Sequence, residues 1–202
     1  MNHHWSQYDF VVVDVEGTGN NPQEIIELAV VPIRQGRIAE TKHEWMIRPV
    51  GPVTNQASKL HGIFDSDLAG KPKFGDVSSE IADVLGHYAV VGHNVGVDVQ
   101  LLREELPSWE PMVAIDTLKL AKYVIPGAAS YALDALVNNL GVGDEQNRKA
   151  HRATSDALVT AQLFLALTSM LEKRGELRLR TLAEMSASIK DPFFKTTQQS
   201  LF

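Results

Sequence analysis

The stretch FVVVDVEGTG (residues 10–19) is a β-branched run that leads into two acidic residues and a glycine-rich turn. The run predicts a buried strand from Phe10 to Val13 that ends on Asp14. Asp14 and Glu16 are two residues apart, so their side chains leave the same face of a strand and can converge on one cation. An isolated Asp-x-Glu pair is more often ordinary turn chemistry, so the interpretation as a metal site depends on the rest of the chain.

The pattern of apolar residues predicts an α/β fold in which a central mixed five-stranded sheet is flanked by helices. Strands are expected at residues 10–13, 25–33, 41–47, 89–91 and 113–115, and the first three are expected to form an antiparallel meander. Helical spacing is predicted for residues 56–61, 76–85, 97–105, 118–124, 131–140 and 152–174.

Length and composition predict one globular domain, residues 1–185, followed by a flexible tail, residues 186–202. With 202 residues and 44% hydrophobic composition, the chain can form one substantial core, and a second full domain would be cramped. After Met185 the apolar periodicity stops and the sequence becomes mostly polar, which is typical of a flexible segment.

Composition also limits the cellular compartment and the kinds of partner that we expect for the protein. The chain has no cysteine, which excludes disulfides and thiolate zinc sites and suits a reducing compartment. The N-terminus lacks the features of a secretory signal, and no apolar run approaches the roughly 18 residues that span a bilayer. We therefore expect a soluble, cytoplasmic protein with no membrane partner. The formal net charge of -6 argues against a broad basic surface that coats nucleic acid, although clustered carboxylates that hold cations would exaggerate this acidity.

Two further acidic residues have local settings that suit a shared site. Asp98 follows the His93-Asn94 turn and lies in the first turn of a predicted helix, where the helix dipole alone also favours an acid. Asp156 lies five residues after His151 at the start of the longest predicted helix, among small apolar residues. Burial of an ionised carboxylate is costly unless it is paired or binds a metal, so Asp156 most needs a partner. If the fold brings the four acids together beside the histidine, they form a site for two divalent metals that suits phosphodiester chemistry.

The order and spacing of these residues resemble one family closely. The pattern D-x-E-x-T covers residues 14–18, H-N-x-x-x-D covers residues 93–98, and H-x-x-x-x-D covers residues 151–156. In this order they resemble the DEDDh 3′-to-5′ exonucleases, a family that includes the proofreading epsilon subunit of DNA polymerase III, exonuclease X, ribonuclease T and oligoribonuclease. The resemblance covers about residues 8–172 and includes the stretches IIELAVV, KLHGIFDSDL, AIDTLKLAK and YALDAL. It implies a ribonuclease H-like fold.

The resemblance also implies a role for each matching residue. Two magnesium or manganese ions would be held by Asp14, Glu16, Asp98 and Asp156, and the general base would be His151. Hard divalent cations suit such an all-carboxylate set of ligands. Because histidine changes its charge close to neutral pH, activity is expected to fall in mild acid.

The same resemblance places Gly17, Thr18, His93 and Asn94 close to the terminal nucleotide of the substrate. A strand-ending turn and a turn before a helix explain these four residues about equally well. The chain departs from the family pattern at Gly17, where many members carry threonine, and at Val97, where they often carry phenylalanine. Both positions lie at the edge of the terminal-nucleotide pocket in the family, so the grip on the last base is expected to differ.

The charged residues outside the motifs predict structural support for the site and only weak binding of nucleic acid. Glu27, within the second predicted strand, is interpreted as hydrogen-bonded structural support rather than as a metal ligand. Candidate phosphate contacts are few: they are Arg148, Lys149 and Arg152 around the histidine, and Lys119 and Lys122 on another predicted helix. Affinity for nucleic acid is therefore expected to be weak and salt-sensitive.

The last five residues, Gln198-Gln199-Ser200-Leu201-Phe202, resemble the pentapeptide that binds the bacterial sliding clamp. In that motif a glutamine and the terminal Leu-Phe pair enter a pocket on the clamp, so Gln198, Leu201 and Phe202 are the expected partner-binding residues. Two large apolar residues at the end of a polar tail have no core to join. The alternative is a tail that packs on its own domain or binds nothing.

These observations lead to one functional hypothesis and two alternatives. The hypothesis is a metal-dependent 3′-to-5′ exonuclease that releases nucleoside monophosphates from DNA 3′ ends in proofreading or repair, tethered to the clamp and with a DNA polymerase catalytic subunit as a further possible partner. The first alternative keeps the chemistry but changes the substrate to RNA, as in ribonuclease T. The second is a non-catalytic binding module, against which the five intact positions argue. The sequence leaves open whether the protein is a polymerase subunit or a free-standing enzyme.

Overall fold

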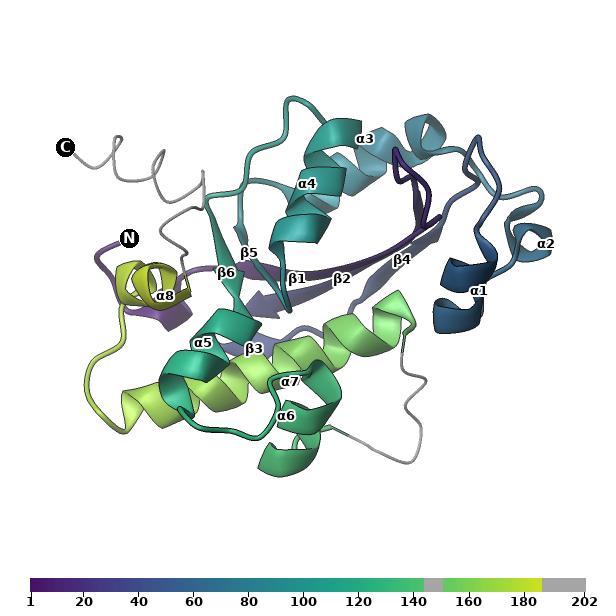
Figure 1. Ribbon diagram of the computed structural model, residues 1–202. Coiled ribbons are helices and arrows are strands. Elements are labelled where there is room, and N and C mark those ends of the chain that lie inside the picture. Colours follow the sequence, from purple (N-terminus) through teal and green to yellow (C-terminus); the bar gives the residue numbers. More distant parts are fainter. Residues whose placement is uncertain (144–150, 187–202) are drawn as a thin grey trace.

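The computed structural model describes residues 1–143 and 151–186, and its centre is a mixed β-sheet with helices on both faces (Figure 1). The strands have the order β3-β2-β1-β5-β6, and β4 also pairs with β2. They are β1 (Phe10–Gly17), β2 (Ile25–Arg34), β3 (Arg37–Ile38), β4 (His43–Met46), β5 (Ala89–Gly92) and β6 (Val113–Asp116). β2 pairs antiparallel with β1 and β4, whereas β5 pairs parallel with β1 and β6, so the predicted antiparallel start and mixed sheet are confirmed.

The described sheet has six strands rather than the predicted five. The additional strand is β3, which has two residues and pairs with the end of β2. Gln35 and Gly36 connect the two strands with φ angles of 51° and 71°, the conformation that a two-residue hairpin turn requires. A two-residue strand shows no alternation of apolar and polar residues, so pairing with β2 defines it and the sequence pattern does not.

Every predicted helix has a counterpart in the structure. The helices are α1 (Asn55–His61), α2 (Asp65–Leu68), α3 (Phe74–Leu85), α4 (Gly96–Glu105), α5 (Thr117–Val124), α6 (Leu133–Leu140), α7 (Ala153–Glu172) and α8 (Leu179–Ser186), with a short 3-10 helix at Trp5–Gln7. The prediction missed α2, α8 and the 3-10 helix. These elements are short, and α8 is identified by its packing on α5 and β6 rather than by a long periodic pattern.

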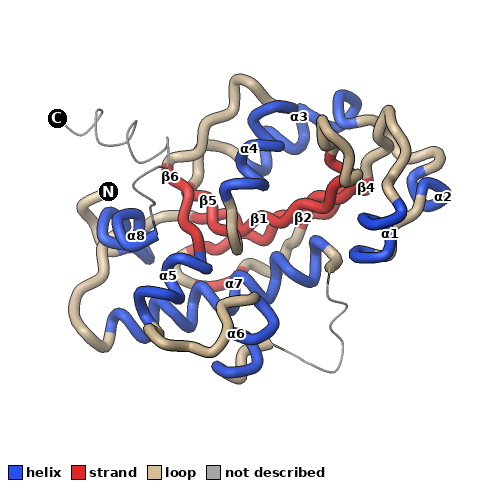
Figure 2. The backbone as a smooth tube through the Cα atoms, viewed as in Figure 1, coloured by secondary structure: helices blue, strands red, loops and turns tan. Residues whose placement is uncertain are grey.

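The helices form two layers around the sheet, with α3 and α4 on one side and α5, α6 and α7 on the other (Figure 2). Along β1, Phe10 and Val12 belong to the core beneath α7, whereas Val11 and Val13 belong to the core beneath α3 and α4. Because side chains alternate along a strand, Asp14 and Glu16 continue the face that α7 covers. The acidic pair therefore emerges from the core on the side where α7 begins.

By length and composition alone, α7 is the one described helix that could cross a membrane. In the most apolar 18-residue window of this helix, 56% of the window is buried inside the protein. Phe164 and Leu167 of this helix are fully buried in the core against the sheet. The core helix of a globular protein has the same composition, and the packing of α7 accounts for its apolar character.

Candidate active site

Asp14, Glu16 and Asp156 form an acidic cluster at the carboxyl end of β1. The strand presents the first two, and the third projects from the first turn of α7. One carboxylate oxygen from each residue lies within 4.8 Å of the other two. Within residues 1–143 and 151–186, this is the one group of three acidic or histidine side chains arranged closely enough to hold a metal ion.

Asp98 reaches the same strand end from the first turn of α4. Its side chain is buried, and its Oδ1 accepts a hydrogen bond from the backbone N–H of Val15 at 3.0 Å. This contact is possible because β5 runs parallel to β1 and α4 begins just beyond it. Asp98 stands outside the three-oxygen cluster but close enough for its charge to act on Asp14. The structure thus gathers all four predicted acids at one end of the sheet.

Burial at this strand end makes the carboxyl groups of Asp14, Glu16 and Asp98 harder to ionise. Burial raises the pKa of Asp14 well above its usual value, and repulsion from Asp98, Asp156 and other nearby carboxylates raises it further. Burial and repulsion from Asp156 raise the pKa of Glu16 to about 7, and burial raises the pKa of Asp98 to about 7. A bound cation would relieve this repulsion. The donor atoms are all oxygens, so the residues fit a hard divalent cation such as Mg²⁺ or Mn²⁺.

His151 lies two residues before the start of α7, at the border of the described residues. Its side chain is exposed, and its backbone has a φ of 59°, which is unusual for a residue other than glycine. Its backbone N–H donates to Oδ2 of Asp156 at 2.9 Å. The structure therefore places the predicted base next to one of the four acids, and its role as a base stays a prediction.

Thr18 and Gly17 are part of a closely packed turn after β1. Thr18 is fully buried, and its hydroxyl oxygen accepts hydrogen bonds from the backbone N–H groups of Glu24 and Asn20 at 3.2 and 3.4 Å. At Gly17, a Cβ atom would lie 2.0 Å from Nε2 of Gln23, so this glycine makes room for the glutamine side chain. The hydroxyl of Thr18 thus organises the turn, and substrate contact by this segment stays a prediction.

His93 and Asn94 are held by the elements around them. The two ring nitrogens of His93 lie 2.9 Å from the hydroxyl of Thr117 and 3.0 Å from the carbonyl of Tyr131. The backbone N–H of Asn94, which has a φ of 66°, donates to Oδ1 of the buried Asp116 at 3.0 Å. These contacts explain the pair as the turn that positions α4. Substrate contact by either residue is untested.

Arg152 and Glu27 form an ion pair beside the acidic cluster, although the sequence predicts different roles for them. Glu27 is fully buried in β2, and the guanidinium of Arg152 binds its carboxylate at 2.5 to 3.2 Å. This agrees with the interpretation of Glu27 as support. Arg152 was grouped with the phosphate contacts because it is basic and adjacent to His151, but its contact in the structure is with Glu27.

Several predicted residues lie outside the described part of the chain. Gln198, Leu201 and Phe202 of the clamp-like motif fall beyond residue 186, and Arg148 and Lys149 fall between residues 143 and 151. Their predictions stand untested. Val97 is described, and it is 53% exposed at the start of α4; its place at the edge of a nucleotide pocket stays a prediction.

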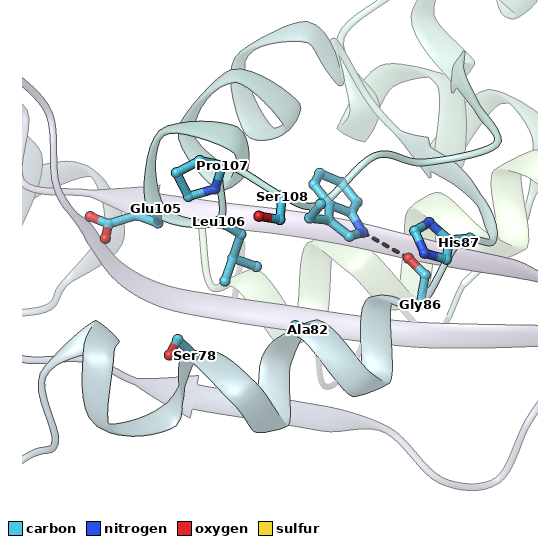
Figure 3. A pocket seen from close by; sticks show the side chains of 9 residues that line it. Ser78, Ala82, Gly86, His87, Glu105, Leu106, Pro107 and Ser108 are labelled. Carbon is cyan, nitrogen blue, oxygen red and sulfur yellow. Dashed lines mark hydrogen bonds between the residues drawn. The ribbon is translucent and has the colours of Figure 1, made fainter.

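A hollow of about 310 Å³ lies away from the acidic cluster, between α3 and the end of α4 (Figure 3). Leu106, Pro107 and Trp109 line it, and the indole N–H of Trp109 donates to the carbonyl of Gly86 at 2.9 Å. None of the predicted catalytic residues lines this hollow. This hollow is therefore not part of the candidate active site.

Comparisons with known proteins agree with this geometry. The family model for Exonuclease (RNase T) matches residues 11–164. The DNA polymerase III subunit epsilon of Aquifex aeolicus is 32% identical over 168 residues, which cover 80% of this chain and 81% of that protein. The PolC-type DNA polymerase III of Thermotoga maritima is 36% identical over 187 residues, which cover 89% of this chain but only 13% of that much longer protein.

Solved structures show the same relationship. Exonuclease X, determined in complex with 5′ overhanging duplex DNA, superimposes with a TM-score of 0.72 at 26% identity, over 88% of this chain and 99% of that chain. The nuclease domain of 3′hExo, a DEDDh family member bound to rAMP, shares the fold with a TM-score of 0.68 at 21% identity. The family match spans both β1 and the first turns of α4 and α7. The chain therefore belongs to the Exonuclease (RNase T) family, and it shares the ribonuclease H-like fold of exonuclease X and of the DEDDh nuclease domain.

Proposed function

We propose that this protein is a metal-dependent 3′-to-5′ exonuclease that releases nucleoside monophosphates from DNA 3′ ends. The observation that carries the proposal is the convergence of Asp14, Glu16 and Asp156 within 4.8 Å at the end of β1, with Asp98 beside them. Such a cluster is costly to the protein unless cations bind it. The nearby histidine completes the set of groups that hydrolysis of a phosphodiester needs.

In this proposal, Asp14, Glu16, Asp98 and Asp156 hold two Mg²⁺ or Mn²⁺ ions. When bound, such ions activate water and stabilise negative charge on a phosphate. His151 accepts the proton of the attacking water, and its exposed position leaves it open to solvent and substrate. Gly17, Thr18, His93 and Asn94 shape the site around the terminal nucleotide, through their backbone turns more than through their side chains.

The relatives favour DNA over RNA as the substrate. The proteins named DNA polymerase III epsilon and PolC are replication enzymes by name, and exonuclease X was solved with DNA. We therefore propose that the protein acts in proofreading or repair in the cytoplasm, with a polymerase catalytic subunit as its partner. The exoribonuclease alternative is retained because the 3′hExo domain was solved with rAMP.

A direct assay separates DNA, RNA and non-catalytic functions. Oligonucleotides of DNA and RNA with a 5′ label are incubated with the full chain and Mg²⁺, and Asp14→Ala serves as the control. We expect a ladder of shortened DNA, release of mononucleotides and no cleavage by the variant. Preferential cleavage of RNA would support the first alternative, and no cleavage of either substrate would favour the non-catalytic binding module.

The domain boundary and the tail form a separate part of the proposal. Residues 1–185 carry the catalytic domain, and residues 186–202 carry a clamp-binding motif that raises the local concentration of the enzyme at DNA. Deletion of residues 198–202 should abolish binding to the sliding clamp of the host while leaving cleavage of short oligonucleotides intact. Unchanged affinity for the clamp would refute the tethering role alone.

A further inference from the structure

The ion pair between Arg152 and Glu27 joins the start of α7 to β2, at the same end of the sheet as the acidic cluster. Glu27 is 0% exposed and lies opposite Glu16 in the register of β1 and β2. Nε of Arg152 donates to both carboxylate oxygens at 3.0 and 3.2 Å, and Nη2 donates to Oε1 at 2.5 Å. The backbone N–H of Ala153 donates to Oε2 at 2.8 Å. Both oxygens of this buried carboxylate are therefore engaged by the residues that begin α7.

These bonds determine where α7 begins relative to the catalytic strand. A carboxylate that accepts a first-turn N–H satisfies a donor that has no partner within the helix and interacts favourably with the helix dipole. His151 directly precedes the ion-paired arginine, and Asp156 follows Ala153 by three residues. His151 has a positive φ, and hydrogen bonds hold the chain on both sides of it: its own N–H donates to Asp156, and the N–H of Ala153 donates to Glu27.

The pair also controls charge next to the acidic cluster. Glu27 adds to the repulsion that raises the pKa of Glu16, and Arg152 opposes it. A fully buried carboxylate beside the cluster could otherwise compete as an additional cation ligand. Because arginine forms two parallel bonds to a carboxylate, it occupies the lone pairs that a cation would use.

A second anchor extends the network to β4. The hydroxyl of Thr154 donates to Glu44 at 2.5 Å, and Nη2 of Arg152 lies 3.9 Å from the same carboxylate. Glu44 is more exposed than Glu27, so this contact is the weaker of the two. The start of α7 is thereby held by two neighbouring strands of the sheet.

We propose that Glu27 and Arg152 are positioning residues, which orient His151 and Asp156 toward β1 and keep the Glu27 carboxylate from binding the catalytic cations. In this role the pair acts on the reaction indirectly, through His151 and Asp156. Its effect on turnover rests on the proposed nuclease function, whereas its effect on cation binding does not. If the pair served folding alone, apolar side chains that restore stability would also restore cation binding and turnover.

The test is therefore a pair of variants that separate stability from positioning. Glu27→Leu with Arg152→Met replaces the neutral ion pair with apolar side chains of similar size, which often preserves stability and leaves the net charge beside the cluster unchanged. Arg152→Lys retains the charge but loses the two-pronged geometry. The matched control is Arg180→Met with Glu184→Gln, which removes an exposed pair on α8.

Three measurements are made on each full-length protein: the melting temperature, the affinity for Mn²⁺ by calorimetry, and kcat and KM on single-stranded DNA. We expect the melting temperature of the double variant to be close to that of the wild type. Its affinity for Mn²⁺ and its kcat should each be about 10- to 100-fold lower, and its KM should be unchanged. Arg152→Lys should show the same direction with a smaller loss. The α8 control should match the wild type throughout.

Wild-type Mn²⁺ affinity and kcat in a folded double variant would overturn the proposal and leave the pair a purely structural feature. If the double variant does not fold, Arg152→Lys decides, since wild-type values in that variant also refute positioning. If the wild type cleaves no nucleic acid, the proposed function fails, but the Mn²⁺ affinities of the variants still test the positioning role.

Discussion

The two halves of β1 differ in the effect that burial has on them. From Phe10 to Val13 the side chains are at most 1% exposed and pack against helices on both faces of the sheet. From Asp14 to Glu16 the strand is half-buried, and its neighbours are carboxylates. Burial stabilises the fold in the first half, whereas in the second it opposes the charges that it confines. The apolar half supplies the rigidity that holds the acidic half together.

The largest effect expected from this contrast follows loss of one acid. Asp14→Asn preserves the shape of the side chain but removes its charge, so activity on DNA should fall at least about 10⁴-fold. The metal-free variant should melt at or above the temperature of the wild type, because repulsion within the cluster is smaller. Single-turnover rates and thermal unfolding in EDTA measure both. A marked loss of stability with residual activity would show that the two halves are not separable.

The opposite substitution tests the apolar half. Phe164 is fully buried on α7 and packs against Phe10 and Trp5, with ring centroids 5.3 and 5.7 Å apart. Phe164→Ala should lower the free energy of unfolding by about 3–5 kcal/mol. Activity well below the melting temperature should stay near that of the wild type, because the acidic cluster is at the other end of the strand. Denaturant titration gives the first value, and a low-temperature rate that drops together with stability would contradict the separation.

An intermediate effect concerns pH. The pKa values of Glu16 and Asp98 are raised to about 7 in the folded protein, and that of Asp14 is also raised. The carboxyl groups of an unfolded chain titrate near pH 4, at roughly 3.9 to 4.3. Between about pH 4 and about pH 7, the folded protein therefore binds more protons at these residues than the unfolded chain does. The metal-free protein should therefore become more stable as the pH falls from about 8 to about 5.

Added Mg²⁺ should reverse part of this trend, since it stabilises the ionised cluster most at high pH. Melting temperatures in EDTA and in Mg²⁺ across the pH range provide the comparison. A metal-free melting temperature that rises with pH over the same interval would contradict the assignment of these shifted groups.

The smallest effect should come from a pair that belongs to neither half of β1. Arg180 and Glu184 form an exposed ion pair on α8, with Nε and Oε1 3.0 Å apart. Arg180→Ala should change the free energy of unfolding by less than about 1 kcal/mol, because water and salt screen such pairs. Activity should be unchanged. A large change in either would show that α8 is coupled to the site.

Much of the fold could be predicted because its elements carry strong local patterns. The apolar runs of β1, β2, β5 and β6 and the periodicity of α3 and α7 are visible in the sequence. β3 escaped prediction because two residues carry no period, and α2 has only one turn. The start of β4 at His43 rather than at Thr41 reflects pairing with β2, which the sequence does not display.

The candidate site divides in the same way. The order and spacing of Asp14, Glu16, Asp98 and Asp156 indicated a shared metal site, since these residue types recur in motifs that span the chain. The partner of Arg152 could not be read from the chain, because Glu27 is 125 positions away in sequence. The same holds for the buried hydroxyl of Thr18, whose neighbours suggested substrate contact as readily as a turn.

The sequence alone determined the family and the order and spacing of the acidic motifs that predict a metal site, because residue chemistry and spacing are local properties. Only the tertiary structure decided that the acids meet at one strand end, that burial there raises the pKa values of Asp14, Glu16 and Asp98, and that Arg152 pairs with Glu27. Distances between remote segments and the burial of their charges arise from packing of the sheet and helices, so they exist only in the folded chain.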